Sequence, residues 1–214
     1  MKKNYTHISV VLDKSGSMSS CVNDTIGGFN QFLKTQKDVK GEATITLVQF
    51  SDDYNITMDM APLTNTEELN GKNYCPAGNT ALLDAIGRTI NRVEGQINDK
   101  PKKSRPEKVI FVIITDGEEN ASREFKRDQI MEMINSHRSD QKWEFVFIGA
   151  NQDSIQAGGS IGVRAGSTLN YAADTKGINT MYCALTSSMT SYRSKSKSET
   201  EDEKFGFFAD TDKT

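Results

Sequence analysis

The sequence predicts a doubly wound α/β fold, with a mostly parallel central sheet, one antiparallel edge strand and helices on both faces. Three observations lead to this prediction. Several short apolar runs are continuous rather than alternating, the segments between them repeat apolar residues at helical spacing, and the two kinds of segment alternate along the chain. Strands that alternate with helices form parallel sheets covered on both faces. With 214 residues, the chain fits one such domain.

Four apolar runs predict central parallel strands, because continuous apolar runs are typical of strands buried on both faces. They are residues 7–12, 44–50, 108–115 and 143–149. A fifth run, 54–60, follows a short Ser-Asp-Asp turn and alternates polar with apolar residues, which predicts a hairpin and an antiparallel edge strand. We expect a short strand near Ser167 to Tyr171 to close the other edge.

Three segments between these strands place apolar residues on one helical face. Their apolar positions are Val22, Ile26, Phe29, Phe32 and Leu33; Leu82, Leu83, Ile86, Ile90 and Val93; and Phe125, Ile130, Met133 and Ile134. A last helix is predicted from about Lys176 to Arg193, with an apolar stripe that packs on the core.

The composition changes near residue 195. We therefore predict a domain over residues 1–195 and a polar, low-complexity tail over residues 196–214. The tail carries Phe205, Phe207 and Phe208, which we expect to dock back on the sheet rather than to serve as a partner motif.

Composition narrows the classes of function. The formal net charge of -3 provides no basic field for nucleic acid or an anionic membrane surface. No apolar stretch is long enough for a membrane span, and the N-terminus lacks the pattern of a signal peptide, so we expect a cytoplasmic protein. Three cysteines do not form a disulfide framework. Cys21 and Cys75 are expected to be buried packing residues, with a redox-sensitive pair as the alternative.

Two carboxylates follow two predicted parallel strands directly. Asp13 comes after the run 7–12, and Asp116 comes after the run 108–115. In open α/β sheets the carboxyl ends of the strands host ligands, at the point where connections leave neighbouring strands in opposite directions. If the two strands are neighbours, the two carboxylates meet in one crevice.

Three hydroxyl residues lie near the same edge. Thr80 precedes a predicted helix, and Ser15 and Ser17 lie between Asp13 and another helix. Taken singly, each hydroxyl can be read as a helix cap or a turn residue.

Taken together, these residues resemble the metal-ion-dependent adhesion site (MIDAS) of von Willebrand factor A domains. The resemblance covers about residues 5–195 and is carried by Asp13-x-Ser15-x-Ser17, Gly78-Asn79-Thr80 and Ile114-Thr115-Asp116-Gly117. It implies that Ser15, Ser17 and Thr80 supply hydroxyl oxygens to Mg²⁺, while Asp13 and Asp116 act directly or through water.

The donor set fits a hard cation, because Mg²⁺ prefers oxygen ligands in an octahedron. Mn²⁺ is the alternative, and zinc is disfavoured since the set contains no Cys or His. If the carboxylates act mainly by orienting waters and hydroxyls, the ion keeps enough positive character to bind an Asp or Glu of a partner protein. Bacterial and phage proteins that resemble this one often work beside ATPases, which makes an ATPase a candidate partner by analogy alone.

The alternative function is a metal-dependent hydrolase or phosphoryl-transfer enzyme that uses the same carboxylates, with Glu118 or Glu119 as a base. Nucleophilic catalysis by a serine needs a nearby histidine. His7 and His137 are each predicted to lie about 20 Å from the rim, as we call the edge of the sheet that carries Asp13 and Asp116. No phosphate-binding glycine loop is present, since the Gly-Gly pair at 158–159 is expected to follow a short helix rather than to open one. A binding module is therefore the favoured prediction.

Overall fold

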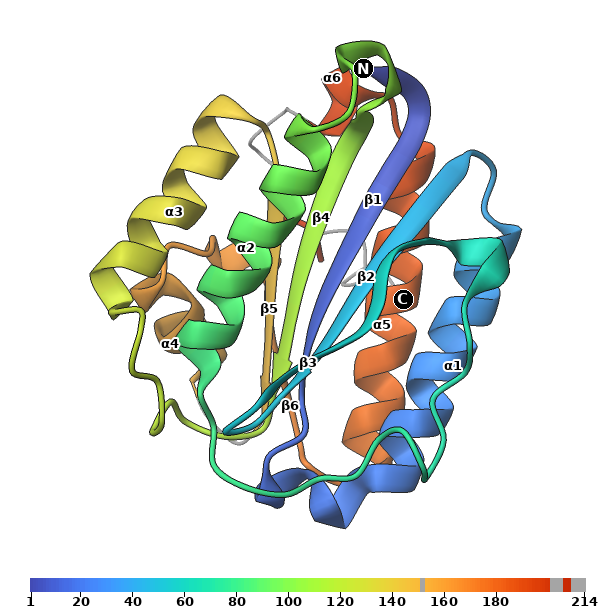
Figure 1. Cartoon of the computed structure of the whole chain (residues 1–214). Helices are drawn as coiled ribbons and strands as arrows, with labels where there is room; N and C mark the ends of the chain where they lie inside the picture. Colours follow the sequence, from blue (N-terminus) through green and yellow to red (C-terminus); the bar gives the residue numbers. More distant parts are fainter. Residues whose placement is uncertain (151–152, 201–205, 209–214) are drawn as a thin grey trace.

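The computed structural model describes residues 1–150, 153–200 and 206–208 and contains one six-stranded sheet between two layers of helices (Figure 1). The strands are β1 (Lys2–Asp13), β2 (Glu42–Phe50), β3 (Tyr54–Pro62), β4 (Pro106–Thr115), β5 (Glu144–Ala150) and β6 (Thr168–Tyr171). Their order is β3-β2-β1-β4-β5-β6, and only β3 runs antiparallel to its neighbour. The predicted fold class is confirmed.

The helices cover both faces of the sheet. They are α1 (Val22–Asp38), α2 (Leu82–Asn98), α3 (Arg127–Asp140), α4 (Ser154–Ser160), α5 (Thr175–Ser194) and α6 (Lys197–Thr200). Helices α1 and α5 lie on one face, and α2, α3 and α4 lie on the other (Figure 1). Within the described ranges, short 3₁₀ turns occupy Gly16–Cys21, Leu63–Asn65, Lys102–Ser104 and Ala165–Ser167.

Each central strand contributes to two apolar cores because successive side chains point to opposite faces. In β1, Val10 and Leu12 pack under α1 and α5, whereas Val11 packs under α2. Close contact between α1 and α5 depends on Gly28, because a Cβ at this position would lie 2.1 Å from the Tyr182 ring.

Two predictions of local secondary structure are wrong. Phe125 lies in the loop before α3 rather than in the helix, because its backbone N–H donates to Asp84. The Gly158-Gly159 pair lies inside α4 and does not follow it.

The last described residues return to the sheet. Phe207 and Phe208 are buried in the core beside α5, and the Phe207 ring lies 5.7 Å from that of Tyr192. The N–H of Phe208 donates to the carbonyl of Gly166. Docking of these two phenylalanines is therefore observed, whereas Phe205 lies outside the described residues. The boundary at residue 195 stays a prediction.

All three cysteines are free thiols. Cys21 is buried, as expected, and its thiol donates to the carbonyl of Met18. Cys75 is exposed and donates to the carbonyl of Gly71, so the expectation of a buried packing residue is wrong there, and no disulfide joins it to Cys21. None of the helices in the described ranges combines the length and the apolar character that a bilayer crossing requires.

Candidate metal centre

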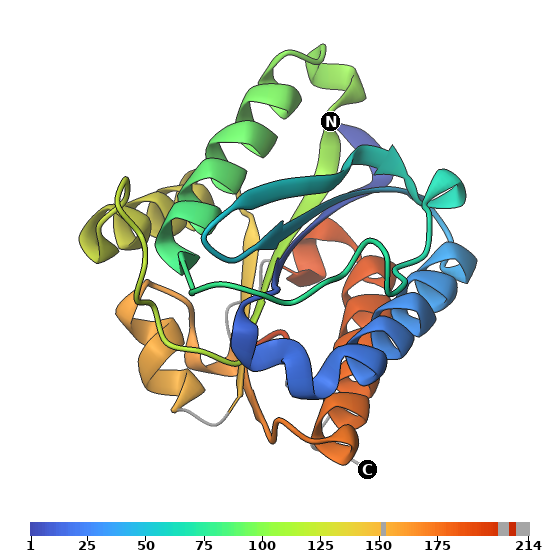
Figure 2. The same cartoon turned by 60° about the horizontal axis from the view of Figure 1, so that its bottom comes forward.

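The candidate site lies at the carboxyl edge of the sheet, between β1 and β4. These two strands are parallel neighbours, with Leu12 opposite Ile114. The chain leaves β1 toward β2 and leaves β4 toward β5, so this is the point where the connections diverge. Figure 2 shows the segments after β1, before α2 and after β4 coming together at this edge. The predicted neighbourhood of Asp13 and Asp116 is therefore present.

Backbone hydrogen bonds hold the first two segments together. The N–H of Ala77 donates to the carbonyl of Lys14 at 2.8 Å, and the N–H of Gly16 donates to the carbonyl of Gly78 at 3.0 Å. Gly78 has a φ of 82°, which favours glycine, and a Cβ there would lie 2.2 Å from a carboxylate oxygen of Asp52. These contacts fix the loop that carries Ser15 and Ser17 relative to the segment that carries Thr80.

A chain of short hydrogen bonds links four of the predicted ligands. Asp13 is fully buried and accepts from the N–H of Ser15 and from the hydroxyl of Thr115, both at 2.6 Å. The Ser15 and Ser17 hydroxyl oxygens lie 3.1 Å apart. The Ser17 hydroxyl donates to Asp116 at 2.6 Å. The two carboxylates thus orient the two serines.

Thr80, the fifth predicted ligand, approaches the same point from the other side. Its hydroxyl oxygen lies 3.1 Å, and that of Ser17 3.7 Å, from the position that a Cβ on Gly117 would occupy. Thr80 is buried, and its backbone N–H and C=O both bond to Asn120. Helix α2 has Ala81 as its N-cap without a side-chain hydrogen bond, so the Thr80 hydroxyl does not cap the helix.

The donors suit an octahedral cation. Adjacent oxygens around an ion with bonds of about 2.1 Å lie about 3.0 Å apart, and the Ser15 and Ser17 oxygens are separated by 3.1 Å. Burial raises the pKa of Asp13 and of Asp116, although their hydrogen bonds oppose the shift. A cation bound here would favour the charged carboxylates. Among the described residues, no three His, Cys, Asp or Glu side chains gather into a metal cluster, so hydroxyls must complete any site.

Two supporting contacts could not be identified from the sequence. Thr115 bonds to Asp13, and Asn120 bonds to Thr80. These contacts join residues that are 102 and 40 positions apart, so no local pattern reports them.

Two carboxylates shape the loop that follows β4. Glu119 accepts from the N–H groups of Leu83, Ala121 and Ser122 and from the Ser122 hydroxyl. Asp84 accepts from the N–H groups of Arg123, Glu124 and Phe125. Both turns are therefore closed by side-chain acceptors, and Asp84 lies about 40 positions before the N–H groups that it accepts from.

Both histidines lie away from the rim. His7 is fully buried in β1, where its ring nitrogens contact the hydroxyls of Thr44 and Ser9 at 2.9 and 3.1 Å. Burial, assisted by the charge of Lys100, lowers the pKa of His7 to about 3. The ring is therefore neutral at physiological pH. His137 is buried near the end of α3, where its Nδ1 lies 2.7 Å from the carbonyl of Met133.

The family model for the von Willebrand factor type A domain matches residues 7–182. No curated protein sequence matches the chain significantly. Among solved structures, proximal thread matrix protein 1 from the mussel byssus is similar in fold, with a TM-score of 0.58 and 12% identity over 87% of this chain and 46% of that one. A second structure of the mussel protein, with the same scores, has a zinc-occupied MIDAS motif.

The ArnB paralog VWA2 from Sulfolobus acidocaldarius is also similar, with a TM-score of 0.54 and 19% identity over 85% of this chain and 44% of that one. The chain thus spans about half the length of these proteins. At these identities the likeness concerns the fold.

Proposed function

Because the chain belongs to the von Willebrand factor type A domain family, we propose that its rim binds Mg²⁺ and uses the ion to capture a carboxylate of a partner protein. The hydroxyls of Ser15, Ser17 and Thr80 would hold the ion. Asp13 and Asp116 would orient these hydroxyls and the bound waters. Domains of this family are usually binding modules without catalytic activity.

The observation that carries the proposal is the 3.1 Å separation of the Ser15 and Ser17 oxygens, which suits adjacent ligands of Mg²⁺. Asp13 supports the same assignment because both of its oxygens already accept short hydrogen bonds. A carboxylate engaged in this way neutralises the ion less than a direct ligand does. When bound, the ion would supply an electrophilic position for a further carboxylate oxygen.

Catalysis by the neighbouring glutamates is not favoured. The carboxylate of Glu119 accepts four hydrogen bonds, from its own loop and from the start of α2. Neither oxygen is therefore left to act as a base. Glu118 is exposed, and both histidines are engaged away from the rim. We propose that the domain binds a partner without turnover, and that it acts in the cytoplasm, where its three free thiols stay reduced.

Metal identity is part of the proposal. Oxygen donors alone favour Mg²⁺ or Mn²⁺ over zinc. The mussel protein nevertheless holds zinc in its MIDAS motif, so zinc must be compared directly.

Titration calorimetry on metal-free protein tests the metal site. We expect Mg²⁺ and Mn²⁺ to bind with a stoichiometry near one. Thr80→Val keeps the shape of the side chain but removes the hydroxyl, and Asp116→Ala removes a carboxylate; both should abolish binding. Glu118→Ala is the matched control, because it removes an exposed carboxylate two residues from Asp116. Equal affinity in Thr80→Val, Asp116→Ala and wild type would contradict the proposed site.

The docking role needs a second assay. Metal-loaded protein should bind an immobilised Ac-Gly-Asp-Gly-NH₂ peptide and should not bind the Asn analogue, and a chelator should release it. Binding that survives the chelator would contradict metal-mediated capture.

A further inference from the structure

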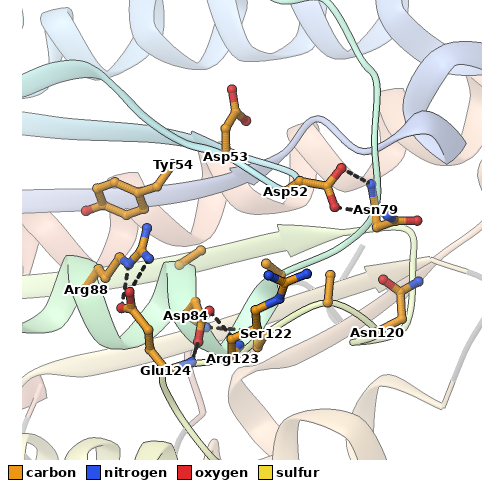
Figure 3. Close-up of a pocket in the computed structure, with 13 residues that line it drawn as sticks. Asp52, Asp53, Tyr54, Asn79, Asp84, Arg88, Asn120, Ser122, Arg123 and Glu124 are labelled. Atoms are coloured by element: carbon orange, nitrogen blue, oxygen red, sulfur yellow. Dashed lines mark hydrogen bonds and ion pairs between the residues drawn. The ribbon is translucent and has the colours of Figure 1, made fainter.

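A polar pocket of about 630 Å³ is lined by residues on either side of Thr80 in the chain (Figure 3). Its walls come from the turn between β2 and β3, the start of α2 and the loop after β4. Asn79 and Ala81 flank Thr80 in the chain. The side-chain oxygen of Asn120 accepts from the N–H of Thr80, and the N–H of Asn120 donates to the carbonyl of Thr80. A partner segment held at the rim therefore lies next to this pocket. The volume falls within the range of ordinary ligand sites, about 300–1,000 Å³.

Four carboxylates line the pocket, and each already has a partner within the chain. Two form ion pairs and two accept backbone or side-chain N–H groups. The ion pairs are Asp53–Lys14 and Glu124–Arg88, and the N–H acceptors are Asp52 and Asp84. Each of these four carboxylates is thus already engaged within the chain.

Two hydrogen-bond donors in the pocket favour an acidic ligand over a cationic one. Within the described part of the chain, the guanidinium of Arg123 makes no ion pair or hydrogen bond, and Figure 3 shows it extending from its loop into the space between Asp84 and Asn79. Asn120 uses its side-chain oxygen on the N–H of Thr80. Its –NH₂ group therefore remains as a second donor at the boundary between the rim and the pocket.

The geometry points to a second acidic recognition position: we infer that this pocket receives a carboxylate of the partner that neighbours the one captured at the rim. The inference rests on the proposed function, and it specifies the partner as a protein with two acidic side chains close together in sequence. Arg123 would bind the second carboxylate through its planar N–H groups, and Asn120 would donate to it.

The loop that carries both donors is held in place before any partner arrives. Glu119 and Asp84 together accept six backbone N–H groups at the two ends of this loop and at the start of α2. A donor that is already positioned loses less conformational entropy on binding. A cationic side chain in the pocket would instead meet Arg123, whose charge has no carboxylate partner among the described residues. An apolar side chain would leave the donors unpaired.

Three peptides test the inference in the presence of Mg²⁺: Ac-Gly-Asp-Gly-Asp-NH₂, and the analogues with Asn or Arg in place of the second Asp. Binding is followed by nuclear magnetic resonance on ¹⁵N-labelled protein, which also reports the side-chain Nε–H of Arg123. We expect the diacidic peptide to bind about tenfold more tightly than the Asn analogue, the scale of one charge-assisted contact. The Arg analogue should bind no better than the Asn analogue.

Arg123→Gln should remove the preference for the second Asp and leave binding of the Asn analogue unchanged. Lys126→Gln is the matched control, since it removes an exposed positive charge from the same loop outside the pocket lining. Equal affinities for the diacidic peptide and the Asn analogue, a preference that survives Arg123→Gln, or tighter binding of the Arg analogue would overturn the inference while leaving the metal site standing. Failure of all three peptides to bind in the presence of Mg²⁺ would overturn the proposed function and this inference together.

Discussion

Replacing Asp84 should destabilise the protein through the loop that follows β4. The carboxylate of Asp84 is buried at the start of α2 and accepts the N–H groups of Arg123, Glu124 and Phe125 at 2.8, 2.9 and 2.9 Å. A hydrogen bond to a charged group contributes about 1.5–3 kcal/mol. Because the three bonds share two oxygens and the freed N–H groups regain some water, we expect Asp84→Ala to cost about 3 kcal/mol of unfolding free energy.

Urea denaturation at pH 7 measures this cost, and Asp128→Ala supplies the control. Asp128 also lies in the first turn of a helix but is exposed, so its removal reports only the helix-dipole contribution, about 0.3–1 kcal/mol. Asp84→Asn retains one oxygen acceptor and should lie between the two. A loss below about 1 kcal/mol for Asp84→Ala would refute the reasoning, since it would equal the dipole contribution alone.

The pH dependence of the Asp84 contribution has a definite sign. Burial alone would raise the pKa of this carboxyl, but the three backbone donors outweigh it, and the pKa is lowered. A group with a lowered pKa in the folded state stabilises fully above its unfolded pKa, about 3.9, and loses this contribution as the pH falls through the folded value. The difference between wild type and Asp84→Asn should therefore be constant from neutral pH down to about pH 5 and shrink below about pH 4.

Three further substitutions, one of them with a matched control, probe packing and the rim. Gly28→Ala should lower the free energy of unfolding by about 1–3 kcal/mol through overpacking, because the new Cβ would lie 2.1 Å from the Tyr182 ring. Gly27→Ala is the control: a Cβ there would meet nothing within 4 Å, so this change should be neutral or stabilising in thermal denaturation. Gly117→Ala should lower the Mg²⁺ affinity measured by calorimetry by about tenfold or more, because the new Cβ would lie 3.1 Å from the Thr80 hydroxyl oxygen. The free energy of unfolding measured in urea should fall by less than about 1 kcal/mol. Unchanged Mg²⁺ affinity would place the ion elsewhere. Phe207→Ala should cost about 3 kcal/mol if the docking seen beside Tyr192 stabilises the fold in solution, and a loss near zero in urea would contradict that role.

The strands and their parallel or antiparallel direction could be predicted from the sequence because buried parallel strands and amphipathic helices carry local signals, whereas the strand order came from the structure. The run 108–115 lies within β4, and the alternating run 54–60 lies within the antiparallel edge strand β3. The same local reasoning failed at Phe125, whose apolar side chain fits a helical stripe although its backbone bonds to Asp84, 41 positions earlier. Periodicity reports which side chains are apolar and does not report which distant acceptor takes a backbone N–H.

In the candidate site, too, the sequence predicted the residues that follow local signals and missed those that depend on distant contacts. Its five residues stand at predicted strand or helix ends, so the sequence alone could bring Asp13 and Asp116 to one edge. The sequence could not reveal the role of Asn120, which joins Thr80 to the neighbouring pocket. Nor could it reveal that Arg123 lines this pocket with a guanidinium that has no partner among the described residues. Both depend on how a loop without regular structure is folded by non-local hydrogen bonds.

We propose above that Ser15, Ser17 and Thr80 surround one divalent cation. Titrating substoichiometric Mn²⁺ into ¹⁵N-labelled protein tests it most directly, because the paramagnetic ion broadens the resonances of the nearest amides. We predict that the amides of Ser15, Ser17, Thr80 and Gly117 broaden first, that excess Mg²⁺ reverses the effect, and that Thr80→Val abolishes it. Broadening that begins instead at the exposed Asp52 and Asp53, or that spreads evenly over the acidic surface, would contradict the claim.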